Sequence, residues 1–359
     1  MNLFASKTFS VGLAALACLL AAPARPGITY EMVTVGNAGN AGDSGGTGNG
    51  AVAYDYQIGK YDVTIGQYTT FLNAVATTDT NSLWRSTMAN EEAIAGISRS
   101  GVSGAYSYSV LNNGGDSSNR PITYVSWFDA ARFTNWMANG QPTGAQDSST
   151  TENGAYNVAG ATDGFAPLRN ATNPNTGAAP SFHIATNDEW YKSAYYSPVL
   201  NSGAGGYWDY ATQSDTAPGN IIGSEGNQAN YKAGGVYSVT QIGDFDPFYQ
   251  NYLTDVGAFT SSASYYGTFD QSGNVANWLE VEFRGFNPNA NFRGGEWDVS
   301  DPSRLRSLGT APTYYEGYNG FRLASSVASG VPEIDPSSFG SALALVLGSL
   351  GLFERRRAR

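Results

Sequence analysis

The chain has 359 residues, of which 44 are glycine, 14% are charged and 13% are aromatic, with tyrosine the commonest aromatic. The aromatic content excludes a disordered chain, and the abundance of glycine is typical of a loop-rich domain rather than of a helical bundle. The net charge of −11 disfavours nucleic acids and anionic membranes as partners, because both bind basic patches.

The first 24 residues have the pattern of a signal peptide. A basic n-region precedes an apolar run over residues 11–22, and Ala22-Pro23-Ala24 forms a small-x-small cleavage site. The alternative is a lipoprotein signal with Cys18 as the lipidated residue, although the three residues before it fit that pattern poorly. We therefore expect an exported domain over residues 25–330, with a net charge of about −13 and no disulfide, since Cys18 is the one cysteine of the chain.

Residues 37–50 are rich in Gly, Asn and Ser and predict a flexible loop, after which residues 55–61 alternate as in a strand. A helix is predicted to follow, with Thr64 as its N-cap, because apolar residues then recur with helical spacing. The apolar positions are Tyr68, Phe71, Leu72 and Val75. They lie on one face, which we expect to pack into the core.

Two further helices are predicted from pairs of residues with capping-box spacing. Ser126 pairs with Asp129 at the start of the second helix, and Thr186 pairs with Glu189 at the start of the third. The polar stretch 140–180 between these helices is expected to be a loop.

His183 lies in a predicted strand just before the third helix. Strand alternation places it opposite Phe182 and Ile184, so we expect a structural or solvent-facing histidine rather than a catalytic one. From residue 207 onward the pattern predicts strands, turns and loops, without an internal repeat or a second domain boundary.

Residues 331–359 form a tripartite tail. Val331-Pro332-Glu333-Ile334 is followed by an apolar run over residues 339–353 and by a cluster of arginines. A helix of that run would be about 22 Å long, short of the ~30 Å core of a bilayer, with the arginines on the cytoplasmic side. The tail resembles a PEP-CTERM sorting signal, which implies an exosortase-type processing enzyme, transient membrane anchoring through the helix, and a final location in the cell envelope, at the cell surface or in the extracellular matrix. The alternative is an ordinary tail anchor.

Several sequence blocks follow one another in order between residues 34 and 325. They are residues 58–64, 125–130, 186–191 and 270–278, then Arg293-Gly294-Gly295-Glu296-Trp297 and Gly320-Phe321-Arg322. These blocks and their order resemble the formylglycine-generating enzyme (sulfatase-modifying factor) family. The resemblance implies an α+β domain with that family's C-type-lectin-like fold, which has little regular secondary structure.

The oxidases of this family bind copper(I), a soft ion that prefers sulfur, through a pair of cysteines. By resemblance the two cysteines would lie near Val299 and Arg304, yet residues 298–319 contain no cysteine. A related iron-dependent branch needs several histidines, and His183 is the only one in the chain. We therefore expect neither copper nor iron, which disfavours a formylglycine-generating oxidase that acts on sulfatases.

The resemblance also implies a calcium site in the block that begins at Asp270. Asp270 and Asn277 would provide side-chain oxygens, and Gly273 and Val275 would provide backbone carbonyls, which suits the hard oxygen ligands of calcium. Asn277 stands where the family usually has Glu, so the site loses a charge and we expect a lower affinity. The alternative is a buried turn of Asp and Asn without a metal.

A second calcium site is implied by Asn230, Tyr231, Asp246 and Phe248. In the family an Asn side chain, the carbonyl of the next residue, an Asp side chain and a later carbonyl bind the ion, and these residues occupy comparable positions. Asp244 is an alternative to Asp246. The other interpretation is a polar surface loop without a metal.

Tyrosines are grouped in the segments that flank the family's substrate groove. They are Tyr265, Tyr266, Tyr314, Tyr315 and Tyr318. Exposed tyrosines suit a glycan or peptide ligand, because they offer an apolar face with a polar tip, whereas the alternative is that they fill the core. Arg293, Glu296 and Arg322 also belong to the family blocks, and we expect them to be structural.

These patterns together predict an exported, non-catalytic, calcium-stabilised domain that binds a glycan or peptide at the cell surface. One alternative is a formylglycine-generating oxidase, which the missing cysteines disfavour. Another is a structural component of an extracellular matrix. The sequence does not identify the ligand, the processing position or the oligomeric state.

Overall fold

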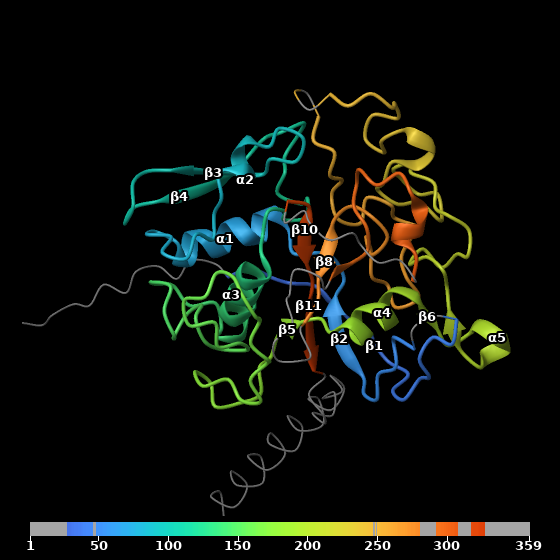
Figure 1. Ribbon diagram of the computed structural model, residues 1–359, viewed down its shortest axis with the longest axis horizontal. Coiled ribbons are helices and arrows are strands. Elements are labelled where there is room, and N and C mark those ends of the chain that lie inside the picture. The colour runs from blue at the N-terminus through green and yellow to red at the C-terminus, as the bar shows by residue number, and fades with distance from the viewer. Residues whose placement is uncertain are drawn as a thin grey trace, which may run out of the picture.

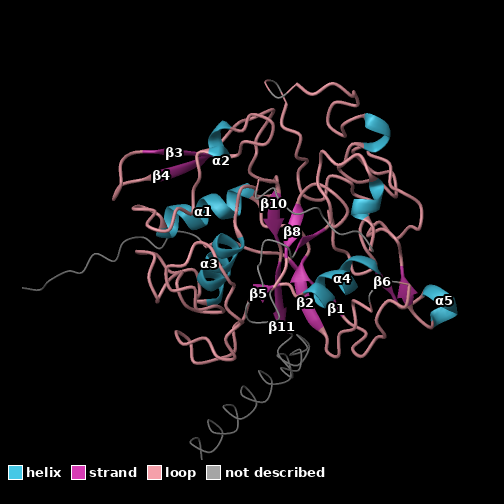
Figure 2. Cartoon of the chain, in the orientation of Figure 1, coloured by secondary structure: helices cyan, strands magenta, loops and turns pink. Residues whose placement is uncertain are grey.

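The structure is a computed structural model that describes residues 27–45, 48–246, 248, 250–280, 292–307 and 317–326 (Figure 1). Short helices and strands are joined by long loops, which confirms the predicted α+β fold class with little regular secondary structure (Figure 2). The predicted signal peptide and the tripartite tail lie outside the described residues. Within the described part of the chain, no helix has the length and apolar character needed to cross a membrane.

A four-stranded antiparallel sheet joins the two ends of the domain. Its strands are β1 (Met32–Val35), β2 (Tyr56–Gly59), β11 (Leu323–Ser326) and β5 (His183–Ile184), in that order across the sheet. β11 pairs with β2 on one side and with β5 on the other. The last described strand is therefore enclosed by strands from earlier in the chain, near the centre of the molecule (Figure 1).

A second, three-stranded sheet lies beside the first. β8 (Ala276–Trp278) pairs in parallel with β10 (Asn319–Phe321) and antiparallel with β9 (Phe292–Arg293). In this register Asn277 lies opposite Gly320. Two short hairpins complete the strands: β3 (Ile97–Ser100) with β4 (Ser107–Val110), and β6 (Tyr196–Ser197) with β7 (Gly206–Tyr207).

The three predicted helices are confirmed as α1 (Ile65–Val75), α3 (Trp127–Ala138) and α4 (Asn187–Tyr195). Each helix begins with a complete capping box. The hydroxyl of the N-cap residue accepts a hydrogen bond from the backbone N–H of the residue three positions later, and the side chain of that later residue accepts one from the backbone N–H of the N-cap residue. Shorter helical segments are α2 (Thr87–Asn90), α5 (Leu200–Gly203), η1 (Ala233–Gly235) and η3 (Pro302–Leu305).

Aromatic side chains join α1, α3 and the second sheet into the main core. The ring of Phe133 lies 5.3 Å from that of Phe71 on α1 and 5.3 Å from that of Phe321 on β10, both edge-on. Such edge-to-face pairs contribute about 0.5–1.5 kcal/mol each beyond the burial of their area. All residues of α3 are buried, so this helix forms the centre of the core rather than one of its faces.

The glycine-rich loop that follows β1 packs on α4. The Tyr191 hydroxyl donates to Asp43 Oδ2 at 2.6 Å, and the Gly50 N–H donates to Asp188 Oδ1 at 2.8 Å. The segment was predicted to be a flexible loop. It has no helix or strand in its described parts, and tertiary hydrogen bonds hold those parts against the helix.

Candidate functional site

A buried ion pair lies where the end of β2 meets the link between β10 and β11. Arg322 Nη2 is 3.0 Å from Asp62 Oδ1, and both side chains are fully buried. The guanidinium also donates to the Gly59 carbonyl at 2.8 Å and to the Phe269 carbonyl at 2.7 Å. Arg322 thus joins three distant segments, which agrees with the structural role expected for it.

Asp62 has one carboxylate oxygen that is bonded and one that is not. Oδ1 accepts from Arg322 and from Asn277 Nδ2 at 2.9 Å. Oδ2 is buried and has no hydrogen-bond partner among the described residues. Burial raises the pKa of Asp62 above its ordinary value, although the Arg322 charge opposes this. Such an orphaned buried anionic oxygen is costly unless something binds it.

Asn277 is predicted as a calcium ligand, and both the oxygen and the nitrogen of its side-chain amide form hydrogen bonds. Its Oδ1 accepts from Trp190 Nε1 on α4 at 2.8 Å, and its Nδ2 donates to Asp62. Because an indole N–H can only donate, this contact determines which end of the amide is oxygen. The side chain therefore bridges α4 and the end of β2.

Asp270 begins a tight turn of left-handed residues. Its φ is 61°, and those of Gly273 and Asn274 are 101° and 66°. Asp270 Oδ2 accepts from the Gly257 N–H at 2.7 Å. Burial, together with the charge of Asp62, raises the pKa of Asp270 to about 7. The charge of Asp62 therefore acts on the Asp270 carboxyl across the site.

Position 273 requires glycine because the backbone approaches that of Asn230 closely there. A Cβ added there would lie 2.3 Å from the carbonyl oxygen of Asn230. Asn230, predicted for the second calcium site, also donates from Nδ2 to Asn274 Oδ1 at 3.0 Å. The structure therefore packs Asn230 against the turn of the first predicted site.

The remaining residues of the second predicted site lie in different surroundings. The Tyr231 carbonyl accepts from Asn220 Nδ2 at 3.1 Å, and Asp246 and Phe248 are exposed. Tyr252 lies between Asn230 and Asp246, because its carbonyl accepts from the Asn230 side chain and its hydroxyl accepts from the Asp246 N–H at 2.8 Å. No group of three or more His, Cys, Asp or Glu side chains is placed to hold a metal ion within the described ranges. Both calcium sites stay predictions.

The positions of the missing thiols are occupied by residues that do not fit copper. Val299 is buried, and its carbonyl accepts from the Lys232 N–H at 2.9 Å. Arg304 lies in η3 and carries a positive charge. Close by, burial and the charge of Asp298 raise the pKa of Glu296 to about 7. Nothing in the local sequence pattern indicated this shift, because it depends on tertiary burial.

The predicted tyrosine groups belong to separate parts of the structure. Tyr265 is 40% exposed and lies edge-on to Tyr266 at 5.2 Å, while the Tyr266 hydroxyl donates to Asn37 Oδ1 at 2.9 Å. Tyr318 instead packs against Trp297 at 5.6 Å. Tyr314 and Tyr315 lie outside the described residues.

Trp297 is the centre of an aromatic cluster that the sequence did not reveal. Its ring stacks on Tyr252 at 5.1 Å and on Phe245 at 6.1 Å, and it also contacts Tyr237 at 5.8 Å. Phe245 is 49% exposed, so the cluster reaches the surface. Tyr237, Phe245 and Tyr252 come from one loop segment, whereas Trp297 comes from a later segment, and no periodic pattern connects them.

His183 is buried and structural. Its Nε2 lies 3.0 Å from Glu189 Oε2 in a buried pair, and the Tyr54 hydroxyl donates to Glu189 Oε1 at 3.1 Å. Burial alone would raise the pKa of Glu189, but His183 and the Thr186 N–H lower it to about 2. Of the two roles expected for this histidine, the structure therefore selects the structural one.

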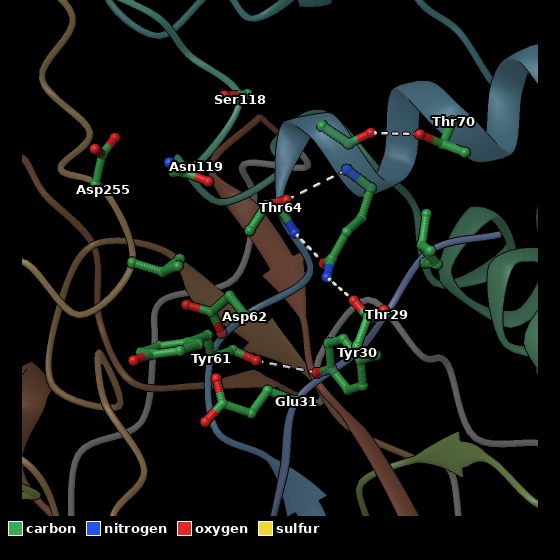
Figure 3. A pocket seen from close by; sticks show the side chains of 14 residues that line it. Thr29, Tyr30, Glu31, Tyr61, Asp62, Thr64, Thr70, Ser118, Asn119 and Asp255 are labelled. Carbon is green, nitrogen blue, oxygen red and sulfur yellow. Dashed lines mark hydrogen bonds between the residues drawn. The ribbon is translucent and has the colours of Figure 1, made fainter. Parts of the chain in front are cut away.

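A pocket of about 640 Å³ opens beside the N-terminus of α1 (Figure 3). Acidic residues, among them Asp62 and Asp255, line it. The first N–H groups of α1 donate to the Thr64 side chain and to the carbonyls of Arg120 and Ser118. Because these helix N–H groups are already bonded and the lining is acidic, the pocket does not suit an anion.

Comparison with known proteins places these features in a family. No curated protein matches the chain. The solved structure titled "Crystal Structure of CarF" is 18% identical, with a TM-score of 0.42, and the match covers 83% of this chain and 99% of that one. The family described as the sulfatase-modifying factor enzyme 1-like domain matches residues 32–327. Since that match spans most of the sequence, the chain belongs to the family of sulfatase-modifying factor enzyme 1-like domains.

Proposed function

We propose that the protein is an exported, non-catalytic member of this family, a calcium-stabilised domain that binds a glycan or peptide at the cell surface. The observation that carries the proposal is the absence of cysteine from residues 298–319, with Val299 and Arg304 where the thiols would be. A buried hydrocarbon side chain and a guanidinium cannot replace thiolates as ligands of copper(I).

Calcium is supported by the chemistry of the donors around Asp270. Carboxylate, amide and carbonyl oxygens are hard ligands, which calcium prefers and copper(I) does not. Asp270 itself provides a carboxyl group held in a tight turn. The part of the chain predicted to be exported has no disulfide to stabilise it, so a bound ion would add stability that packing must otherwise supply.

Ligand binding is supported by the exposed aromatic surfaces. Tyr265 and Phe245 each present a ring to solvent, one beside the loop that follows β1 and the other at the edge of the Trp297 cluster. Exposed rings suit the apolar faces of sugars and of peptide side chains. The acidic overall charge also favours a neutral or cationic ligand over an anionic one.

Metal analysis of the purified exported protein, with melting measured with and without a chelator, tests the proposal. We expect bound calcium, a lower Tm in chelator, and no copper or iron. A peptide substrate that contains a target cysteine should remain unconverted in the same preparation. Stoichiometric copper, or conversion of the cysteine to formylglycine, would establish the oxidase instead.

A glycan and peptide array separates ligand binding from a purely structural matrix role. We expect selective binding that Tyr265→Ala or Phe245→Ala weakens, while Phe165→Ala, an exposed ring elsewhere on the surface, leaves it unchanged. Binding of no ligand on either array would favour the structural component. Mass spectrometry of the cell-surface form would show whether the ends at residues 24 and 331 have been removed.

A further inference from the structure

We propose that Asp62 provides the second carboxylate of the calcium site at Asp270, in place of the side chain at position 277. The inference deepens the calcium part of the proposed function and rests on it. It concerns a residue that lies 208 positions before Asp270 in the sequence and outside the block in which the site was predicted.

Asn277 does not fit the role of an acidic ligand in this chain. It carries no charge, and its oxygen already accepts from Trp190 Nε1 at 2.8 Å. To bind an ion through that oxygen, the side chain would have to share or give up this buried hydrogen bond, which is unfavourable because the indole N–H would be left without an acceptor.

Asp62 has the free oxygen that Asn277 lacks. Its side chain is fully buried, and Oδ1 is held by Arg322 and Asn277. These contacts orient the carboxylate and leave Oδ2 without a partner in the described part of the chain. Buried carboxylate oxygens without donors are rare, and a hard cation is the ligand that satisfies one most strongly.

The segments that carry Asp62 and Asp270 run side by side. The Phe269 N–H donates to the Lys60 carbonyl at 2.9 Å, and the rings of Tyr61 and Phe269 are 5.6 Å apart. Arg322 Nη2 also bonds both Asp62 Oδ1 and the Phe269 carbonyl. These contacts bring Asp62 next to the residue before Asp270.

Charge balance decides how tightly the site can bind. Asp62 and Asp270 provide two carboxylates, of which Arg322 already balances one. The carbonyls of Gly273 and Val275 in the turn after Asp270 would be the neutral ligands. The Arg322 guanidinium next to Asp62 opposes a further cation. We therefore expect an affinity in the range of weak extracellular calcium modules, on the order of 10⁻⁴–10⁻³ M.

Calcium titration calorimetry on the purified exported protein tests the assignment. Asp62→Asn keeps the shape of the side chain and removes its charge, so calcium binding should weaken at least about tenfold. Asp62→Glu should retain binding. Asp255→Asn removes a nearby exposed carboxylate and should change the dissociation constant less than about twofold.

Trp190→Phe provides a second test that does not disturb the Asp62–Arg322 pair. It removes the shorter of the two hydrogen bonds that the Asn277 oxygen accepts, the other coming from Arg322 Nε at 3.4 Å, so calcium should bind about as before if Asp62 is the ligand, and more tightly if Asn277 is. Asp62→Asn with unchanged affinity, or Trp190→Phe with tighter binding, would overturn the assignment while the calcium proposal stands. A wild-type protein that binds no calcium would overturn both.

Discussion

Arg322 and Asp62 lie 260 positions apart in the chain and form an ion pair from which solvent is excluded. The pair connects the end of β2 to the link between β10 and β11, and Arg322 extends it to the carbonyl before Asp270. The two ends of the domain are thus joined by one pair of charges at the predicted calcium site.

Removing one partner of this pair should destabilise the fold strongly. Arg322→Met leaves the Asp62 carboxylate buried without its counter-ion, and we expect a loss of about 3–5 kcal/mol in the free energy of unfolding, measured by urea denaturation. Lys60→Met is the matched control, because Lys60 pairs with Glu31 at the surface and should cost less than about 1 kcal/mol. Equal losses in the two variants would contradict the structural role of the buried pair.

The Glu189–His183 pair predicts a specific acid sensitivity. The pKa of Glu189 is lowered from 4.5 to about 2 in the folded protein, so this carboxylate contributes stability above pH 4.5 that is lost as the pH falls toward 2. The shift corresponds to about 3 kcal/mol. Glu189→Gln should therefore be less stable than wild type at pH 7 and close to it near pH 2.

The measurement is the free energy of unfolding against pH for wild type, Glu189→Gln and an exposed control, Glu92→Gln. The control should follow the wild-type curve within about 0.5 kcal/mol. A constant offset between wild type and Glu189→Gln from pH 7 to pH 2 would show that the pair does not depend on the charge of Glu189.

Alanine substitutions at Gly273 and at Gly104 distinguish the cost of a steric contact from the cost of backbone strain. Both have a left-handed φ, 101° and 94°, but an added Cβ meets the Asn230 carbonyl only at Gly273. We expect Gly104→Ala to cost about 1–2 kcal/mol from the backbone alone. Gly273→Ala should cost at least about 2 kcal/mol more, because the Asn230 backbone must move as well. Thermal melting of the two variants compares them directly, and equal Tm losses would argue against the close approach.

The capping box of α1 can be tested with two threonines on one helix. Thr64→Ala removes the hydroxyl that accepts from the Gln67 N–H and should cost about 1 kcal/mol. Thr70→Ala, within the same helix, only removes a hydroxyl that donates back to the Gly66 carbonyl, and should be neutral within about 0.5 kcal/mol. Chemical denaturation measures both, and a larger loss at Thr70 would contradict the capping role of Thr64.

The local elements of this protein could be predicted because their signals are local. The capping pairs Ser126–Asp129 and Thr186–Glu189 marked two helices, and helical spacing after Thr64 marked the third. The order of the family blocks indicated the fold class. The expectation that Arg322 is structural also agrees with the structure.

The composition of the candidate site could be predicted only in part. Asp270 was proposed as a ligand from its block, and that proposal is still a prediction, whereas Asp62 and Trp190, which contact Asn277, come from other segments. No spacing rule connects residues 62, 190 and 277. The placement of Asn230 against the Asp270 turn, rather than beside Asp246, was likewise invisible in the sequence.

Residue types and their near neighbours are enough to predict which helices form, which residues cap them, and that no thiol chemistry is available between residues 298 and 319. The tertiary contacts were needed to show that one Asp62 oxygen has no partner among the described residues, that the Asn277 oxygen is hydrogen-bonded, and that the pKa of the Glu296 carboxyl is raised. These properties arise from burial and from contacts between distant segments, and neither is encoded in any local pattern.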